Sequence, residues 1–186
     1  MRSQSPIVLA LTLAFTAGFV SPALSAQDAD AASETSAALT PLSLDVADFK
    51  VNAQFPCAQP DRAPAGDNGS EAHMCVVGDA MFVLAVAVVG DEATTGPMQP
   101  NFDTAFNEVE ESSDTVSLER IEIGGRRTMI GERGPDPKFG TIRAVELNED
   151  IVVYAVTLSR PGLKEALSDA DKARMRSFTE ALEIAP

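Results

Sequence analysis

The stretch Ala80–Val89, with the sequence AMFVLAVAVV, is apolar throughout and is bounded by Gly-Asp pairs on both sides. A run of this length is also compatible with a buried helix. Because it is rich in valine, contains a phenylalanine and lies between two turn signals, we predict a central strand covered on both faces. A second run of this kind, Ile151–Leu158 (IVVYAVTL), is predicted to be another central strand of the same antiparallel sheet.

The segment before the first apolar run contains two shorter predicted strands. Phe49–Phe55 alternates apolar and polar residues, which is typical of a strand with one buried face. Pro56 ends this strand, because proline cannot donate to a ladder. Residues 59–69 are rich in Pro, Gly, Asp and Asn and are predicted to form a loop, after which the chain returns as a strand over residues 73–77.

A hairpin is predicted in the second half of the chain. Gly124-Gly125 is typical of a tight turn, and we expect it to join strands over residues 116–123 and 126–133. The apolar phase of the first strand slips between Leu118 and Ile121, as it would at a β-bulge. A further strand is predicted over residues 141–147.

The predicted helices follow from capping residues and apolar spacing. Asn101 is a typical N-cap, and the apolar residues at 102, 105, 106 and 109 form one stripe, so we predict a helix from Phe102 to about Glu111 packed on the sheet. A helical segment is also expected over residues 163–167. Ser168 or Asp169 can then cap a helix that runs to about Ser177. Residues 180–184 could extend that helix, but we favour a strand.

One short signature resembles a known family. The string Phe49-x-Val51-x-x-x-Phe55-Pro56-Cys57-x-x-Pro60 is followed by a strand with Cys75, an apolar strand, one helix, a three-strand meander and a final helix. This order is similar to that of small secreted domains of the PsbP, Mog1 and DcrB type. The resemblance covers roughly Leu42 to the C-terminus and implies an α+β fold, with helices packed on an antiparallel β-sheet. It implies a binding or accessory module more than an enzyme, and it transfers no functional residue.

The first residues have the layout of a secretory signal peptide. Arg2 opens a short basic start, residues 7–20 are apolar, and Ser21–Ala26 supply the small residues that a signal peptidase recognises. We therefore predict a signal peptide over residues 1–26, a flexible acidic leader over 27–40 and a single α+β domain over 41–186. The processed protein is expected to be periplasmic or secreted and not stably inserted in a membrane, unless the signal stays uncleaved as an anchor.

Export would place the two cysteines where thiols oxidise. We predict one disulfide between Cys57 and Cys75, because an even pair in an exported chain is typical of a structural bridge. A redox-active pair usually has the spacing Cys-x-x-Cys, which these two residues lack. The chain-entropy model gives about 3 kcal/mol of stabilisation for a loop of this length.

The chain is strongly acidic. It contains 28 Asp and Glu against 14 Lys and Arg, a net charge of −14, and nearly all of the excess lies in residues 27–115. This charge repels phosphate backbones and anionic lipid headgroups, which argues against nucleic acid binding. Acidity also promotes solubility, so on its own it does not indicate a partner.

The sequence contains no catalytic or metal-binding motif. His73 is the only histidine, and a single imidazole without a placed partner indicates neither acid–base catalysis nor a multi-histidine metal site. We expect it to face solvent beside the disulfide. Residues 67–71 carry oxygen ligands around a glycine but lack the full spacing of a calcium loop, and no serine has the G-x-S-x-G context of a nucleophile. We predict no catalytic residue, no metal ligand and no cofactor.

Basic residues are concentrated in one region of this acidic chain. Residues 118–143 have a net charge of +2, and adjacent antiparallel strands can display their basic side chains on one face. Arginine binds carboxylates bidentately, which suits an acidic partner. The candidate partner-binding residues are Arg120, Arg126, Arg127, Arg133, Lys138 and Arg143. The alternative is that they only balance carboxylates on neighbouring strands, namely Glu119, Glu122, Glu132 and Asp136.

Taken together, these patterns predict an exported, non-catalytic α+β module that binds a protein partner in the cell envelope, and an acidic protein is the expected partner. The alternative is a carrier of a small ligand or metal ion that uses a pocket between the sheet and a helix. A pocket lined by convergent polar groups would favour the carrier, whereas a flat apolar or basic patch would favour the partner-binding module. An enzyme is the third hypothesis.

Overall fold

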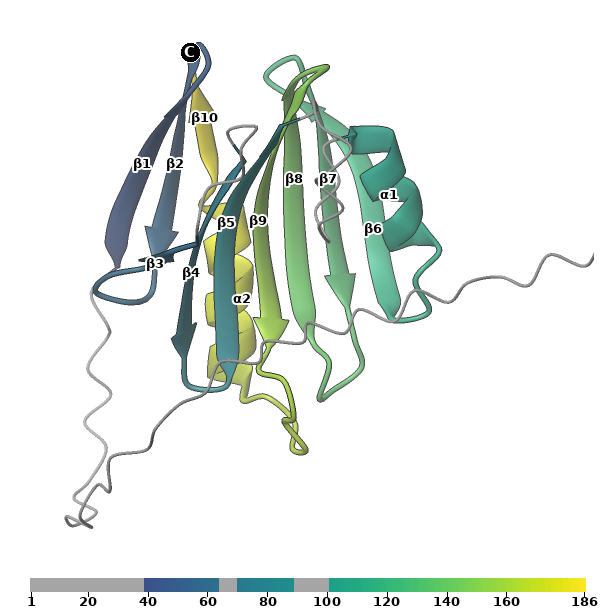
Figure 1. Ribbon diagram of the computed structural model, residues 1–186. Coiled ribbons are helices and arrows are strands. Elements are labelled where there is room, and N and C mark those ends of the chain that lie inside the picture. The colour runs from purple at the N-terminus through teal and green to yellow at the C-terminus, as the bar shows by residue number, and fades with distance from the viewer. Residues whose placement is uncertain (1–38, 64–69, 89–100) are drawn as a thin grey trace, which may run out of the picture. The chain divides into compact units, whose positions relative to one another are not determined.

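The computed structural model describes residues 39–63, 70–88 and 101–186. The larger of two antiparallel sheets has the strand order β3-β4-β5-β9-β8-β7-β6 (Figure 1). Its strands are β3 Asp61–Arg62, β4 Glu71–Val77, β5 Ala80–Val88, β6 Thr115–Ile123, β7 Arg126–Arg133, β8 Gly140–Asn148 and β9 Ile151–Ser159. The smaller sheet has the order β1-β2-β10, with β1 Thr40–Val46, β2 Phe49–Phe55 and β10 Glu183–Ala185. The helices of these ranges are α1 Phe102–Glu110 and α2 Asp169–Glu180.

Strands β5 and β9 lie side by side in the middle of the larger sheet, antiparallel to each other. Successive side chains of a strand point to opposite faces, so an apolar strand contributes to two cores. Phe82 and Leu84 of β5 belong to one buried cluster, and Val83 and Ala85 belong to the other. The prediction of two central strands covered on both faces is therefore confirmed.

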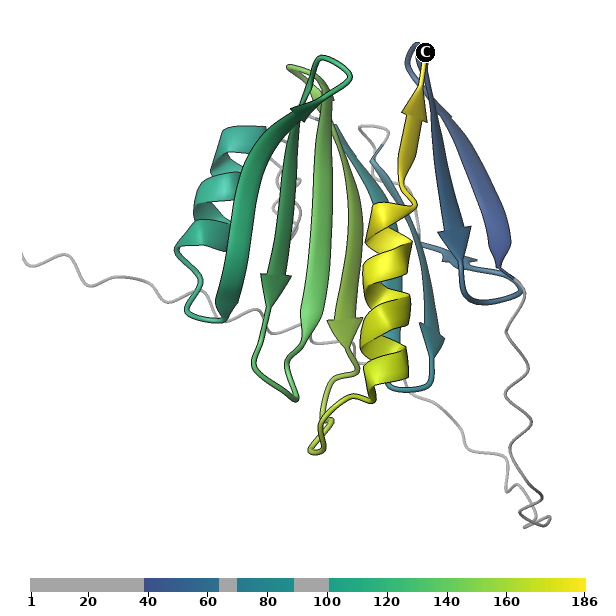
Figure 2. The same cartoon turned by 180° about the vertical axis from the view of Figure 1, so that it is seen from behind.

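One face of the larger sheet packs against α2 and the smaller sheet (Figure 2). Phe178 of α2 contacts Phe55 of β2 and Phe82 of β5, with ring centroids 5.0 and 5.5 Å apart in edge-to-face geometry. All three rings are buried. This aromatic cluster joins the helix to both sheets.

The opposite face of the larger sheet packs against α1, so the two helices lie on opposite faces (Figures 1 and 2). Asn101 is the N-cap of α1, and its side chain accepts a hydrogen bond from the amide of Thr104 at 3.0 Å. Phe102 and Ala105 are buried, whereas Phe106 is only half-buried. The predicted helix and its apolar stripe are confirmed.

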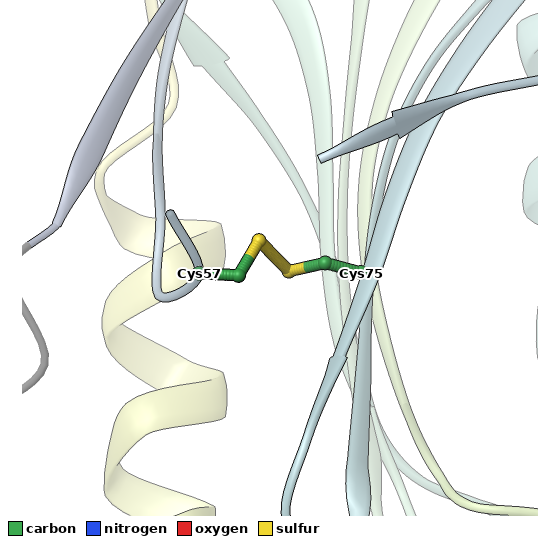
Figure 3. The surroundings of a disulfide bond; sticks show 2 residues. All are labelled: Cys57 and Cys75. Atoms are coloured by element: carbon green, nitrogen blue, oxygen red, sulfur yellow. A yellow bond between two sulfur atoms is a disulfide. The ribbon is translucent and has the colours of Figure 1, made fainter. Parts of the chain in front are cut away.

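The predicted disulfide is present between Cys57, which follows β2, and Cys75 in β4 (Figure 3). Since β2 belongs to the smaller sheet and β4 to the larger one, the bond links the two sheets covalently. It lies beside the cluster that contains Phe55 and Phe82, since both cysteines pack against that cluster. The disulfide therefore holds the two sheets together beside the same core against which α2 packs.

The structure corrects the prediction of one sheet. Strand β2 does not pair with β5 or β9 but belongs to the smaller sheet, between β1 and β10. The strand β1 is not among the predicted elements, whereas β10 confirms a strand at the C-terminal end. Alternation of apolar and polar residues predicts a strand, but it does not specify which strand is the neighbour.

Two local predictions are wrong. Pairing of β6 with β7 is continuous from Ser117 to Ile123, and the register shift lies between Thr115 and Ser117 rather than between Leu118 and Ile121. Ile121 breaks the apolar phase because it is 37% exposed on an edge strand. Residues 163–167 form no helix, because Gly162, with φ of +85°, and the N-cap Ser168 leave too short a segment between them for helix nucleation.

Three buried threonines fix α2 on the larger sheet. Thr141 of β8 and Thr157 of β9 share a hydrogen bond of 2.7 Å between their hydroxyls, and Thr141 also donates to the carbonyl of Met175 at 3.2 Å. Thr179 of α2 donates to the Thr141 hydroxyl at 3.3 Å. Because β10 follows α2 after two residues, this contact also positions β10.

In the described ranges, no helix has the length and apolar character needed to cross a membrane.

Candidate functional site

The six predicted basic residues form three groups instead of one patch. Adjacent strand residues point to opposite faces, so Arg126 lies on the α2 face of β7 and Arg127 on the α1 face. Arg126 lies over the ring of Phe49, from the smaller sheet, whereas Arg127 contacts Asp103 of α1. The groups are Arg120 with Arg127, Arg133 with Lys138, and Arg126 with Arg143.

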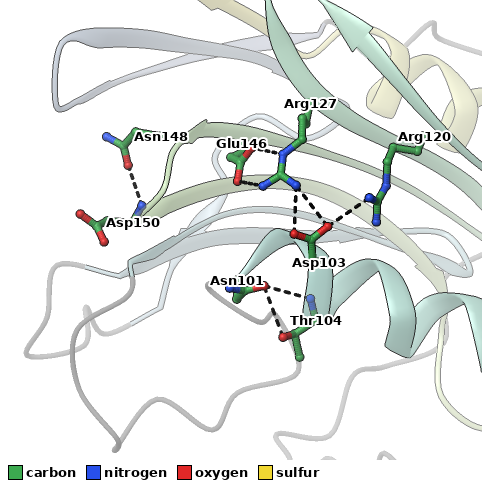
Figure 4. A network of polar contacts seen from close by, with 8 residues as sticks. All are labelled: Asn101, Asp103, Thr104, Arg120, Arg127, Glu146, Asn148 and Asp150. Atoms are coloured by element: carbon green, nitrogen blue, oxygen red, sulfur yellow. Dashed lines mark hydrogen bonds and ion pairs between the residues drawn. The ribbon is translucent and has the colours of Figure 1, made fainter.

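On the α1 face, Arg120 and Arg127 are held by carboxylates (Figure 4). Arg127 bonds Glu146 of β8 and Asp103 of α1, the latter at 3.0 Å, and Arg120 bonds Asp103 at 3.1 Å. The hydrogen bond from Arg127 holds the pKa of Asp103 below its usual value. Arg120 also lies 4.2 Å above the ring of Phe106. This network fastens the first turn of α1 to β6, β7 and β8.

The second group is also neutralised internally. Asp114 accepts from Arg133 at 3.1 Å and from Lys138 at 3.3 Å. The hydrogen bond from Lys138 is the main cause that lowers the pKa of Asp114. The carboxylates that hold these groups are not the ones expected from the sequence, since Glu132 pairs with Arg176 and Asp136 with Lys172, both of α2.

The third group lines an open cleft of about 380 Å³. One wall comes from the β6–β7 hairpin and β8, and the other from Leu182 and β10. The cleft therefore lies between the two sheets, not between a sheet and a helix. Its lining residues are Ile123, Gly124, Arg126, Thr128, Arg143, Val145, Leu182, Glu183, Ile184 and Ala185.

The two arginines of the cleft have no carboxylate bonded to them within the described residues. The Arg126 guanidinium lies 4.6 Å from the centroid of the Phe49 ring. Arg143 donates through Nη1 to the backbone carbonyl of Glu180 at 2.9 Å, while its Nε is buried without a hydrogen-bond partner. Burial lowers the pKa of Arg143, and the nearby charge of Glu180 opposes this effect.

Exposed isoleucines flank the cleft. Ile123 pairs with Arg126 and Ile121 with Thr128 in the β6–β7 register, so these side chains share the α2 face of the sheet. Ile121, Ile123 and Ile130 are 37%, 42% and 38% exposed. The charge pattern of the sequence identifies Arg126 as a candidate but does not identify the isoleucines. Their signal in the sequence is the pair of β-branched apolar residues, Ile121 and Ile123, directly before the Gly124-Gly125 turn that leads to Arg126.

His73 and residues 67–71 are the remaining groups that the sequence raised as candidates for catalysis or metal binding. Contrary to expectation, His73 is 8% exposed, and its Nε2 has no hydrogen-bond partner and lies 3.8 Å from a carboxylate oxygen of Glu71. His73 shares with Cys75 the face of β4 that packs on the core, which explains its burial. Among described residues no group of three or more His, Cys, Asp or Glu could hold a metal ion. Most of the calcium-like loop lies outside them.

Comparisons with known proteins identify no family. No family model matches the chain, and no curated protein matches it. One solved structure to which it is similar is described as that of LpqN, involved in cell envelope biogenesis of Mycobacterium tuberculosis. That similarity covers 83% of this chain and 88% of LpqN, at 13% identity and a TM-score of 0.25. These values are too low to assign a fold family or a function.

Proposed function

We propose that this protein is an exported, non-catalytic α+β module that binds a protein partner in the cell envelope. In this proposal its fold is of the PsbP and Mog1 type, and its location is periplasmic or secreted. The observation that carries the proposal is the mixed surface around the cleft. There, exposed isoleucines share one face of the β6–β7 hairpin with Arg126, which has no carboxylate bonded to it within the described residues.

This surface has the composition of a protein-binding patch. Interface cores are enriched in apolar residues and arginine, and arginine is a frequent hot-spot residue. Ile121, Ile123 and Ile130 lie on one face of one hairpin, so a partner can cover them together. Among the described strands, β6 is also an edge of the larger sheet, and its outer backbone groups could pair with an added strand.

The shape of the cleft favours a macromolecule over an enclosed small ligand. Small-molecule sites usually bury most of the ligand surface, whereas this cleft is open and continuous with exposed isoleucines. A carrier of a small ligand remains the alternative, since Arg126 and Arg143 line the same cleft.

Site-specific photocrosslinking in the export compartment tests the proposal. A photoreactive residue is placed at Ile121, at Ile123 and, as a matched control, at Val76, which is 55% exposed on β4. We expect the two hairpin positions to give an adduct of the same discrete mass that Val76 does not give. Adducts of equal yield at all three positions, or none at the hairpin, would contradict the proposal.

A further inference from the structure

The cleft between the sheets is lined by the two basic residues of the region that are not paired with a carboxylate among the described residues. Four of the six basic residues of the region are bonded to carboxylates of the chain itself, whereas Arg126 and Arg143 are bonded to none among the described residues. These same two residues line one cleft. On a chain with a net charge of −14, two such guanidinium groups beside one cavity are an unusual arrangement.

We propose that the cleft binds the carboxylate of an acidic side chain on an extended segment of the partner protein. Arg126 and Arg143 would donate the hydrogen bonds that hold this carboxylate. This inference rests on the function proposed above. It adds the chemistry of the partner: one Asp or Glu flanked by apolar residues.

Both guanidinium groups are already held in place. Arg126 is stacked over Phe49, and Arg143 is anchored by the carbonyl of Glu180. Each keeps further N–H donors, because a guanidinium has five and the contacts among the described residues use at most one of them. A carboxylate that enters the cleft would bond N–H groups of the two side chains that line it. Because both side chains are already held in place, little side-chain entropy would be lost on binding.

The walls of the cleft suit an extended peptide. One wall is β10, which among the described strands is an edge of the smaller sheet, and its outer edge can pair with an added strand. The other wall carries Ile123 and Val145. Side chains of an extended segment alternate, so an acidic residue can face the arginines while its neighbours contact apolar atoms.

The cleft also contains one acidic group, which limits what it can bind. Glu183 of β10 lies on the wall and is exposed. Its charge would repel a second carboxylate nearby, because like charges at close range oppose binding. The site should therefore favour a single acidic residue among apolar ones over an acidic cluster.

Titration with a defined peptide tests this inference. The probe is a capped Val-Glu-Val peptide, with Val-Gln-Val as its neutral analogue, added to the isotopically labelled chain purified after export. The readout is the NMR signal of the Nε–H groups of Arg126 and Arg143. We expect saturable shifts with the Glu peptide and none with the Gln peptide up to about 20 mM, a range that covers weak affinity.

The neighbouring arginine provides a matched control. Arg126→Gln should weaken binding of the Glu peptide about tenfold, as expected for loss of a charge-assisted hydrogen bond. Arg127→Gln removes the same charge from the same strand on the opposite face and should leave binding unchanged. Equal shifts with both peptides, or equal affinity in Arg126→Gln and the unsubstituted chain, would overturn the inference. Succinate binding as tightly as the peptide would also overturn it, in favour of a small-anion carrier.

The crosslinking experiment separates failure of this inference from failure of the proposed function. If Arg126→Gln leaves the adduct at Ile123 unchanged, the partner-binding function stands and the carboxylate inference fails. If no adduct forms but the Glu peptide still binds selectively through Arg126, the protein-partner function fails and an anion site remains. Thermal unfolding of each variant, monitored by circular dichroism, checks that Arg126→Gln and Arg127→Gln are folded before either result is interpreted.

Discussion

Replacement of Phe178 by alanine should be among the most destabilising single changes in the chain. The side chain is 2% exposed and contacts Phe55 and Phe82 at centroid distances of 5.0 and 5.5 Å. Phe→Ala substitutions in cores cost about 3–5 kcal/mol, which includes the cavity left behind. Each edge-to-face pair adds about 0.5–1.5 kcal/mol beyond area burial. We therefore expect a loss near the upper end, about 5 kcal/mol.

Urea denaturation followed by circular dichroism and by the emission of Tyr154 measures this loss. The chain has no Trp and one Tyr, and Tyr154 lies in the other buried cluster, so its emission reports on the α1 face while circular dichroism reports on the whole fold. If Phe178→Ala does not fold, Phe178→Leu keeps the test usable, with an expected loss of about 1–2 kcal/mol. A loss below about 2 kcal/mol for the alanine variant would refute the claim that this aromatic cluster joins the helix to both sheets.

Four further predictions follow from the structure and the sequence. Phe106→Ala should lower the free energy of unfolding by only about 1–2 kcal/mol, because the ring is half-buried, and urea denaturation measures the difference. Replacing both Cys57 and Cys75 by alanine should lower the free energy of unfolding by about 3 kcal/mol, as urea denaturation measures. The unsubstituted chain, alkylated without reductant, should show no alkylated thiol in its intact mass. Asp103→Asn should lower the urea midpoint at neutral pH and leave it unchanged at low pH, since a carboxylate with a lowered pKa stabilises above its unfolded pKa and loses this effect as pH falls through the folded value. If the signal peptide is removed as predicted, N-terminal sequencing of the mature protein should begin near Ala26 or Gln27.

Sequence patterns predict the local elements of this fold well, because those elements depend on near neighbours. The two apolar runs become the central strands, and the N-cap Asn101 begins α1. The assignment of β2 to a second sheet depends instead on its neighbours, which are β1, a strand that the sequence pattern did not predict, and β10, more than a hundred residues away. Alternation alone carries no information about that pairing.

The candidate site is less predictable from sequence than the fold. Composition identifies the basic region, but the separation of Arg126 from Arg127 requires the strand register, and the neutralising carboxylate Asp103 comes from a helix. The burial of His73 likewise depends on which face of β4 meets the core. The opposite wall of the cleft lies in β10, nearly sixty residues after Arg126.

The length of the turn between β6 and β7 decides which side chains of β7 point to which face of the sheet. Gly124 and Gly125 have φ of +59° and +77°, a conformation that glycine adopts without steric cost. Insertion or deletion of one residue there would shift β7 by one position and send every side chain to the other face. Arg127 would then enter the cleft, and Arg126 would face Asp103. A change of two residues would keep every side chain on its present face. The length of this turn therefore decides which of two adjacent arginines lies in the cleft.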